Sequence, residues 1–378
     1  MSFDPARAER FAEQMTRALN GAALGLMTSV GHRTGLFDVM RERAPASSVE
    51  IARQAGLAER YVREWLGAMT SAGVVEHDPA AGTFFLPPEH AAVLTRAARP
   101  NNLAATFQWI PVLGSVEDEI VSCFERGGGV PYSSYRRFHA VMAEESDQTV
   151  VSGLLEHILP LAKGLPALLA RGADVLDVGC GSGRALAVLA AAFPNSRFTG
   201  VDVCERAIES AGVEARARGL ANLRFEARDA AALDAPDGFD LITAFDAIHD
   251  QAAPAAVLAS IAAALRPDGT FLMQDIAGTS ALHEDAAHPL ATFLYTVSCL
   301  HCMSVSLAAG GAGLGAMWGE RTARRMLADA GFGSVEVKAL PHDPINLYYV
   351  ARKASAASCG ARSEPKANGV TTAGDGWN

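Results

Sequence analysis

The sequence predicts an α/β protein in which a doubly wound, mainly parallel sheet follows a mainly helical amino-terminal domain. Two observations predict this fold class. From about residue 173 to 353, short apolar runs typical of buried strands alternate with helical segments. Before residue 97 the apolar period is helical and ends in a hairpin signal. With 378 residues, 49% of them hydrophobic, the chain is long enough to form two cores.

The charge and cysteine content exclude several classes of partner. A net charge of −10 argues against electrostatic binding of nucleic acid or an anionic membrane. The first residues lack the apolar segment of a signal peptide, and we expect no membrane span, because charge or glycine breaks the alanine-rich apolar runs. Six scattered cysteines indicate reduced thiols, and the pair Cys299 and Cys302 has no second pair that would complete a zinc site. We therefore expect a cytoplasmic protein without a nucleic-acid or membrane partner.

Residues 4–30 have the apolar periodicity of one long amphipathic helix. Such a stripe is more typical of a helix that packs on a partner than of a solvent-exposed helix. We therefore expect a homodimer contact here. The stripe consists of Phe11, Met15, Leu19, Ala22, Leu26 and Val30.

Residues 47–86 have the pattern of a winged helix. A helix opens at Ser47 and stops near Gly56, a second helix covers residues 61–69, and residues 73–76 and 83–86 form a hairpin. This module often reads DNA, but acidic residues outnumber arginines between residues 31 and 89. The sequence therefore favours a role in dimerisation and in covering a site.

We predict four segments from these patterns. They are a helical winged-helix and dimerisation domain (1–96), a helical connector that contributes to the site (97–165), a Rossmann-like domain (166–353) and a disordered tail (354–378).

The most informative motif begins at Asp177. Glycines follow at 179, 181 and 183, between a buried apolar run and a helix, and a second acid, Asp202, comes about 20 residues later. Such a turn leaves backbone N–H groups open at a helix N-terminus, and the later acid can accept ribose hydroxyls. Arg184 occupies the place where a dinucleotide fingerprint requires its last glycine. The motif therefore indicates a cofactor other than NAD.

The predicted strands place further polar residues at one edge of the sheet. We expect strands at 174–178, 197–202, 223–227, 239–244 and 270–275. Ligands of doubly wound sheets bind beyond the carboxyl ends of the strands.

Residues 173–276, including the stretch 265–270, resemble the core of class I S-adenosylmethionine (SAM) methyltransferases. Two other stretches resemble plant-type small-molecule O-methyltransferases and their bacterial winged-helix relatives. One runs from Phe138 to Met142, with Ser146 nearby. The other is His249-Asp250, matching the H-D-W of that family, although Gln251 replaces the tryptophan.

The resemblance implies SAM as cofactor, S-adenosylhomocysteine (SAH) as product and a small molecule as methyl acceptor. It implies a set of cofactor-binding positions, which are Asp177, Gly179, Gly181, Gly183, Asp202, Val203, Asp229, Ala230, Phe245, Met142 and Ser146. Acceptor-binding positions are expected at Phe138, His139, Asp246, His301 and Trp318.

His249 resembles the catalytic histidine of that family, and a histidine suits proton removal from a hydroxyl near neutral pH. Asp250 or Glu320 could orient its ring. His139 and His301 are the reserve candidates for the base. The glycine-rich stretch 308–319 is either a mobile loop that closes with Trp318 over the acceptor or a simple connection.

Three alternatives stay open at this point. Asp246 and Asp275 end neighbouring strands where catechol-type enzymes bind magnesium, but Ile276 stands in place of a third ligand, so we expect no metal. The acceptor atom could be nitrogen, sulfur or carbon instead of oxygen. The chain could also be a winged-helix regulator that senses SAM or a metabolite.

Overall fold

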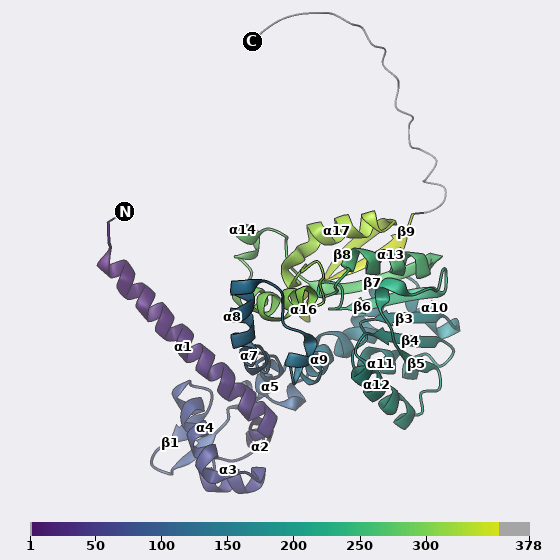
Figure 1. Cartoon of the computed structure of the whole chain (residues 1–378). Coiled ribbons are helices and arrows are strands. Elements are labelled where there is room, and N and C mark those ends of the chain that lie inside the picture. Colours follow the sequence, from purple (N-terminus) through teal and green to yellow (C-terminus); the bar gives the residue numbers. More distant parts are fainter. Residues whose placement is uncertain (1, 355–378) are drawn as a thin grey trace, which may run out of the picture.

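The computed structural model describes residues 2–354. It contains a small helical domain, a helical connector and a sheet domain covered by helices (Figure 1). Residues 355–378, which hold nearly all of the predicted tail, lie outside the described residues.

The amino-terminal domain is a winged helix, as predicted. Helix α1 begins after the N-cap Asp4, and Gly35, in the left-handed conformation, ends it. Ser47 and Glu50 form a capping box at the start of α3. Trp65 and Phe37 pack edge to face in the core of this domain. The elements are α1 (Pro5–Thr34), α2 (Leu36–Met40), α3 (Ser48–Ala55), α4 (Glu59–Ser71), β1 (Glu76–Asp78) and β2 (Thr83–Phe85).

Helix α1 carries its apolar stripe on the outside of the described structure. Residues 2–23 are all exposed, and Leu19 is 71% exposed. In Figure 1 the amino-terminal half of α1 extends away from the rest of the chain. The last turns of the helix are instead buried around His32. The stripe is therefore free to contact another molecule.

The connector is built from short helical pieces between the two larger domains. Two of them, η3 and η4, are π-helical. The pieces are α5 (Pro88–Leu94), η1 (Arg96–Ala98), α6 (Leu103–Thr106), α7 (Trp109–Gly114), α8 (Glu117–Arg126), η2 (Tyr132–Ser134), α9 (Phe138–Ser146), η3 (Asp147–Val151), η4 (Leu154–Ile158), η5 (Leu159–Leu161) and α10 (Leu165–Arg171).

The sheet domain has the strand order β5-β4-β3-β6-β7-β9-β8. The first five strands are parallel, and β9 runs antiparallel to both β7 and β8. From β3 the chain adds β4 and β5 on one side and then β6 and β7 on the other, so the strand order switches between β3 and β6. Doubly wound sheets bind ligands at this switch point. The strands are β3 (Asp174–Val178), β4 (Arg197–Asp202), β5 (Leu223–Ala227), β6 (Phe239–Phe245), β7 (Leu265–Ile276), β8 (Phe332–Leu340) and β9 (Asp343–Lys353).

The structure confirms the predicted fold class, and β3, β4 and β5 have the predicted bounds. Strand β6 extends one residue further, to Phe245. Strand β7 begins at Leu265 instead of Thr270, because Leu265 already pairs with Phe239.

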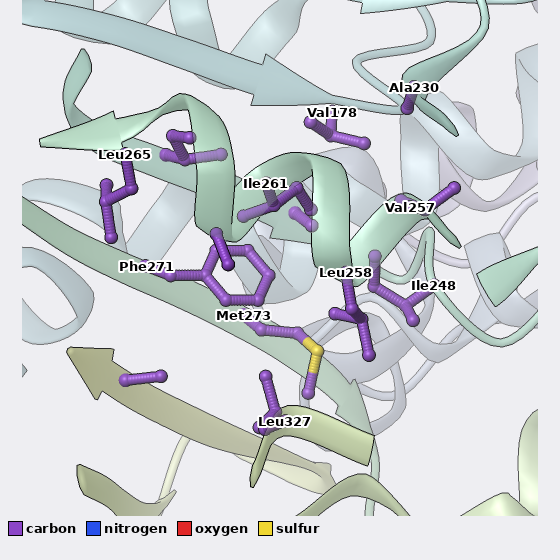
Figure 2. Packing of buried hydrophobic residues seen from close by; sticks show 14 of the residues in the cluster. Val178, Ala230, Ile248, Val257, Leu258, Ile261, Leu265, Phe271, Met273 and Leu327 are labelled. Carbon is purple, nitrogen blue, oxygen red and sulfur yellow. The ribbon is translucent and has the colours of Figure 1, made fainter. Parts of the chain in front are cut away.

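Helices cover both faces of the sheet. Figure 2 shows the core between α13 and β7, where Leu258 and Ile261 pack near Phe271 and Met273. The remaining helices are α11 (Arg184–Ala192), α12 (Glu205–Ala217), η6 (Ala230–Ala232), α13 (Pro254–Ala264), α14 (Leu282–Asp285), α15 (Ala291–Val297), the π-helical η7 (Ser298–Cys302), α16 (Met303–Ala308), η8 (Ala316–Trp318) and α17 (Gly319–Asp329).

One helical stretch, Ala291–Ala308, has the length and apolar composition of a membrane-crossing helix, with a mean hydropathy of 1.4. A third of it is buried within the protein. His301 and Ser304 lie on its buried side. We therefore interpret the stretch as a core helix of the sheet domain.

Candidate active site

The glycine-rich turn joins β3 to α11 at the carboxyl edge of the sheet. Gly179, Gly181 and Gly183 all have positive φ, a conformation that side chains disfavour. A Cβ atom at Gly181 would meet nothing within 4 Å, so the outer side of the turn is open to a ligand. Asp177 points inward instead and accepts a hydrogen bond from Thr243 Oγ1 at 2.6 Å. Burial raises the pKa of Asp177 to about 7.

Asp202, at the end of β4, connects this turn to the next loop. One carboxylate oxygen accepts the N–H of Gly181 at 2.9 Å and the other accepts the N–H of Cys204 at 2.8 Å. The turn and the second acid of the predicted motif are thus in direct contact. Val203, beside Asp202, is 61% exposed.

Two further predicted cofactor positions lie at neighbouring strand ends. Asp229 follows β5, is exposed, and accepts the N–H of Ala231 at 2.8 Å, while Ala230 is buried. Phe245 ends β6 and is half-buried. Because β5, β4, β3 and β6 are adjacent and parallel, these ends all lie on one edge of the sheet.

The connector reaches this edge through α9. Arg184, the first residue of α11, donates to the carbonyl of Ala143 at 3.1 Å and pairs with Asp147. This holds the end of α9, including the half-buried Met142 and Ser146, against the helix that follows the glycine turn.

His139 lies on the cofactor side of α9. Its Nε2 is 3.4 Å from the Sγ of Cys204, and the Asp202 charge acts on its ring. Burial lowers the pKa of His139. His139 therefore lies beside the loop that follows Asp202, and its expected contact with the acceptor stays a prediction.

His249 lies beyond β6 and bonds to an acid at the end of β7. Its Nδ1 is 2.7 Å from Asp275 Oδ1, and both side chains are buried. Trp318 Nε1 and the N–H of Ile276 donate to the same oxygen, each at 2.9 Å. Three donors therefore fix the carboxylate that orients the His249 ring.

The expected orienting acids make other contacts. Asp250 accepts a hydrogen bond from the Tyr132 hydroxyl, and Glu320 pairs with Arg324 at 2.7 Å. The expectation that Asp250 or Glu320 orients His249 is wrong, because Asp275 holds that place. Asp275 lies on β7, 26 residues after His249, so the residues next to His249 in the sequence do not indicate it.

The surroundings of His249 make it a strong base. Burial favours the neutral ring and lowers the pKa of His249, but the Asp275 carboxylate beside the ring outweighs burial and raises the pKa well above its usual value. When its ring is neutral, His249 is therefore a stronger base than a free imidazole.

Tyr132 is a site residue that the sequence analysis missed. It follows the glycines at 127–129, and its hydroxyl donates to Asp250. The N–H of Val130 donates to Ser304 Oγ at 2.8 Å, which fixes the loop to α16. Burial raises the pKa of Asp250 to about 6. The glycine-rich loop gave no sequence signal for a role at the site.

Phe138 and His301 are stacked, with ring centroids 4.2 Å apart and an interplanar angle of 13°. Trp109 and Tyr135 also contact the His301 ring edge to face. The structure therefore brings together Phe138 and His301, two of the predicted acceptor positions, in one aromatic cluster.

Trp318 is 5% exposed and packs in the sheet-domain core. The predicted loop around it is anchored: the N–H of Gly315 donates to the His249 carbonyl at 3.1 Å, and the N–H of Ala312 donates to the Ala252 carbonyl at 2.9 Å. Trp318 thus contacts Asp275 from inside the protein, and the loop supports the His249 segment.

Asp246 sits beside His249 and Asp275 in a strained conformation, with φ +50°. Burial raises its pKa to about 8, and the nearby Asp275 charge acts in the same direction. Ligand atoms of Asp246, His249 and Asp275 lie within 4.8 Å of one another, the one group in residues 2–354 with the spacing of a metal site. Across the same residues, Asp246 Oδ1, Gln274 Oε1 and Asp275 Oδ2 are buried without a hydrogen-bond partner. This donor set fits a divalent cation that prefers oxygen ligands.

Comparisons with known proteins agree with this architecture. Residues 22–96 match the Rv2258c-like winged HTH domain, and residues 169–331 match a methyltransferase domain. Nocamycin O-methyltransferase of Saccharothrix syringae is 34% identical over 140 residues, which is 36% of this chain and 50% of that protein. The chain thus spans about half the length of this curated relative.

Solved structures resemble the chain over nearly its full length. Human N-acetylserotonin methyltransferase, solved in complex with SAM, has a TM-score of 0.66 at 17% identity and covers 94% of this chain and 99% of its own. PigF, solved with SAH, has a TM-score of 0.63 at 18% identity, with 90% and 99% covered. At these identities the likeness shows a shared fold.

Proposed function

We propose that this chain, which belongs to the proteins that combine a winged helix-turn-helix domain with a class I methyltransferase domain, moves a methyl group from SAM to a hydroxyl group of a small molecule. The observation that carries the proposal is the pairing of His249 with Asp275 at the sheet edge that also bears the glycine turn and Asp202. The names of similar proteins, which are O-methyltransferases or SAM and SAH complexes, support the cofactor and the oxygen acceptor.

SAM supplies a methyl group that its sulfonium already makes electrophilic, so the protein mainly has to align the acceptor. His249 then takes the proton of the acceptor hydroxyl on its Nε2, because its Nδ1 is engaged with Asp275. With SAM bound, the electron pair freed on the acceptor oxygen would form the new C–O bond as the C–S bond breaks, and SAH would be the product. Asp275 stabilises the imidazolium that results.

Calorimetric titration of the purified full chain with SAH, and in parallel with NAD, tests the cofactor. We expect micromolar binding of SAH and none of NAD. Absence of SAH binding would contradict the proposal. A His249→Ala variant that keeps nearly full methylation of a hydroxyl acceptor would contradict the role of the base and favour a nitrogen, sulfur or carbon acceptor.

A metal-assisted reaction is a second candidate, favoured by the buried oxygens of Asp246, Gln274 and Asp275 described above. Our first proposal is a metal-free reaction, because a positioned histidine alone can remove the proton. Methyl transfer that survives EDTA supports the metal-free route. The metal-assisted route would replace it if EDTA abolishes the activity of the wild type and Mg²⁺ restores it, while Mg²⁺ restores no activity in Asp246→Asn.

We propose further that α1 makes a homodimer through its exposed stripe. Phe11, Met15 and Leu19 are each more than half exposed on one helical face. Sedimentation of the wild type should give a dimer and that of Leu19→Glu a monomer. A monomeric wild type would contradict this assignment. The arginines of α4, the helix that reads DNA in DNA-binding winged helices, do not favour DNA binding here: Arg60 pairs with Glu64, and Arg63 pairs with Glu59.

A further inference from the structure

The helical stretch 291–308 carries a pair of thiols that the proposed reaction does not use. Cys299 and Cys302 are three residues apart, both are free, and the π-helical turn η7 (Ser298–Cys302) contains them. Side chains at this spacing lie on the same side of a helix, with Cβ atoms about 5–6 Å apart. Two cysteines placed in this way form a C-x-x-C motif, which in redox proteins forms a reversible disulfide. The pair is therefore a candidate for thiol chemistry.

The two thiols differ in their access to solvent. Cys299 is half-buried and lines a surface hollow of about 540 Å³, together with Leu282 and Tyr295. Cys302 is buried, and burial raises the pKa of its thiol. Because the thiolate is the attacking form of cysteine, a reagent from solvent meets Cys299 first. Cys302 is then placed to attack second, as a resolving thiol does.

Closure of a disulfide between these residues requires a small movement of η7. The bond needs Cβ atoms about 3.5–4.5 Å apart, so the turn has to tighten by about 1 Å or more. In the narrower 3₁₀ turn, side chains three residues apart eclipse each other, so tightening brings the two thiols together. A disulfide closed against the local geometry is easily reduced again, which agrees with the free thiols of the structure.

The same turn supports both the connector and the segment of the proposed base. The Tyr135 hydroxyl donates to the carbonyl of Leu300, within η7. On the other side, a Cβ atom at Gly315 would lie 2.6 Å from Ser298 Oγ, so Gly315 packs directly on the start of η7. The N–H of Gly315 in turn donates to the His249 carbonyl at 3.1 Å. Tightening of η7 therefore moves groups that hold the base in place.

We propose that Cys299 and Cys302 are a reversible modification site, a dithiol that a low-molecular-weight disulfide oxidises to an intramolecular disulfide. The Cys299 thiolate attacks one sulfur of the reagent, whose S–S bond breaks as a mixed disulfide forms. The Cys302 sulfur then attacks Cys299 Sγ, and the second half of the reagent leaves as a thiolate. The dithiol loses two electrons, the reagent gains them, and each departing thiolate takes up one of the two thiol protons. Only the effect on methyl transfer rests on the proposed function.

Incubation of the full chain with glutathione disulfide, followed by peptide mapping with mass spectrometry, tests the site. In the wild type we expect the peptide with Cys299 and Cys302 to lose the mass of two hydrogens, and dithiothreitol to restore it. In Cys302→Ser, Cys299 should keep a glutathione adduct, because the resolving thiol is absent. In Cys299→Ser, Cys302 should stay unmodified, because it is buried.

A matched control is Cys123→Ser. Cys123 is also a half-buried thiol on a helix, α8, but the sequence has no other cysteine within four residues of it. This variant should form the disulfide between Cys299 and Cys302 as the wild type does.

The effect on the site is measured with the oxidised wild type and with Cys299→Ser after the same treatment. A displacement of about 1 Å near a reacting group can cost about 100-fold in rate. We expect oxidation to lower the single-turnover rate of methyl transfer to a phenolic acceptor by about tenfold or more in the wild type, with SAH affinity unchanged. The rate of Cys299→Ser should not respond to the treatment.

Each other outcome overturns a stated part of the inference. A lasting glutathione adduct on Cys299 of the wild type, without a disulfide, would show that the two thiols cannot meet. Reaction at Cys123 with none at Cys299 or Cys302 would show that the pair is inert. A disulfide that leaves the rate of methyl transfer unchanged would reject the link to the base. Failure to bind SAH would instead reject the proposed function, and the peptide map does not depend on that function.

Discussion

The cofactor edge and the acceptor side of the site are built in different ways. The central part of the proposed cofactor edge comes from one contiguous strand-turn-helix-strand unit, residues 174–202, which offers backbone N–H groups and Asp202, while β5, β6 and α9 add flanking positions. The acceptor side combines the α7, η2 and α9 segments with His249, Asp275 and His301, and it leaves buried polar atoms without partners within residues 2–354. Within residues 174–202, whose members are close in the sequence, no buried polar side-chain atom lacks a hydrogen-bond partner, whereas Asp246, Gln274, Asp275 and His301 each have one that does.

Asp202→Ala should give a large effect and confine it to the cofactor. It removes the proposed ribose contact and both hydrogen bonds that hold the turn, to Gly181 and Cys204. We expect SAH affinity to fall by about 100-fold or more, since the charged hydrogen bonds from Asp202 to the ribose are lost and the turn loses its anchor. Calorimetry measures it, with His249→Ala as the matched variant that should keep wild-type affinity. Equal losses in the two variants would erase the distinction between the two regions.

His249→Ala should slow methyl transfer without weakening cofactor binding. Removal of a positioned base lowers kcat by about 10² to 10⁴-fold, while the SAH site remains intact. Single-turnover methylation of a phenolic acceptor measures the rate. A rate within threefold of the wild type would assign proton removal to another group.

The pH dependence should identify Asp275 as the partner of the base. Because the Asp275 charge raises the pKa of His249 above its usual value, the ring keeps its proton to higher pH than a free imidazole does, and kcat should rise with pH through an inflection above about 6.5. In Asp275→Asn burial then dominates, and the inflection should move to lower pH with a smaller kcat. An unmoved inflection would show that Asp275 does not act through His249.

Asp246→Asn should give the smallest effect, on stability. The pKa of Asp246 is raised from 3.8 to about 8, so the folded state binds its proton more tightly and loses stability as pH rises through this range. The variant lacks this loss, so its advantage over the wild type should grow with pH to about 1–3 kcal/mol. Chemical unfolding in EDTA at pH 5 and pH 8 measures the difference.

Addition of Mn²⁺ to the same unfolding experiment sharpens it. If Asp246 binds a cation, Mn²⁺ will stabilise the wild type more than Asp246→Asn. An equal change in the free energy of unfolding of the two proteins would show that Asp246 binds no cation.

The winged helix, the first five strands of the sheet domain and the cofactor motif could all be predicted from the sequence, because each depends on local periodicity or on fixed spacing along the chain. The order of the strands in the sheet and the antiparallel pair β8 and β9 were not predicted. Asp177, the three glycines and Asp202 fall within one unit, so their positions relative to one another follow from its geometry. His249 was found through a motif next to a strand end. The bounds of β7 were missed at Leu265 because they depend on pairing with another strand.

The surroundings of His249 could not be predicted, because they depend on how distant segments pack together. Asp275 bonds to it across the junction of β6 and β7, Trp318 reaches Asp275 from beyond the last glycine-rich loop, and Tyr132 joins Asp250 from the connector. These contacts link residues that are separated by many positions, and no periodicity records such pairs. The packing of helices on the sheet edge sets the partner, the burial and thus the basicity of a histidine that the sequence could only locate.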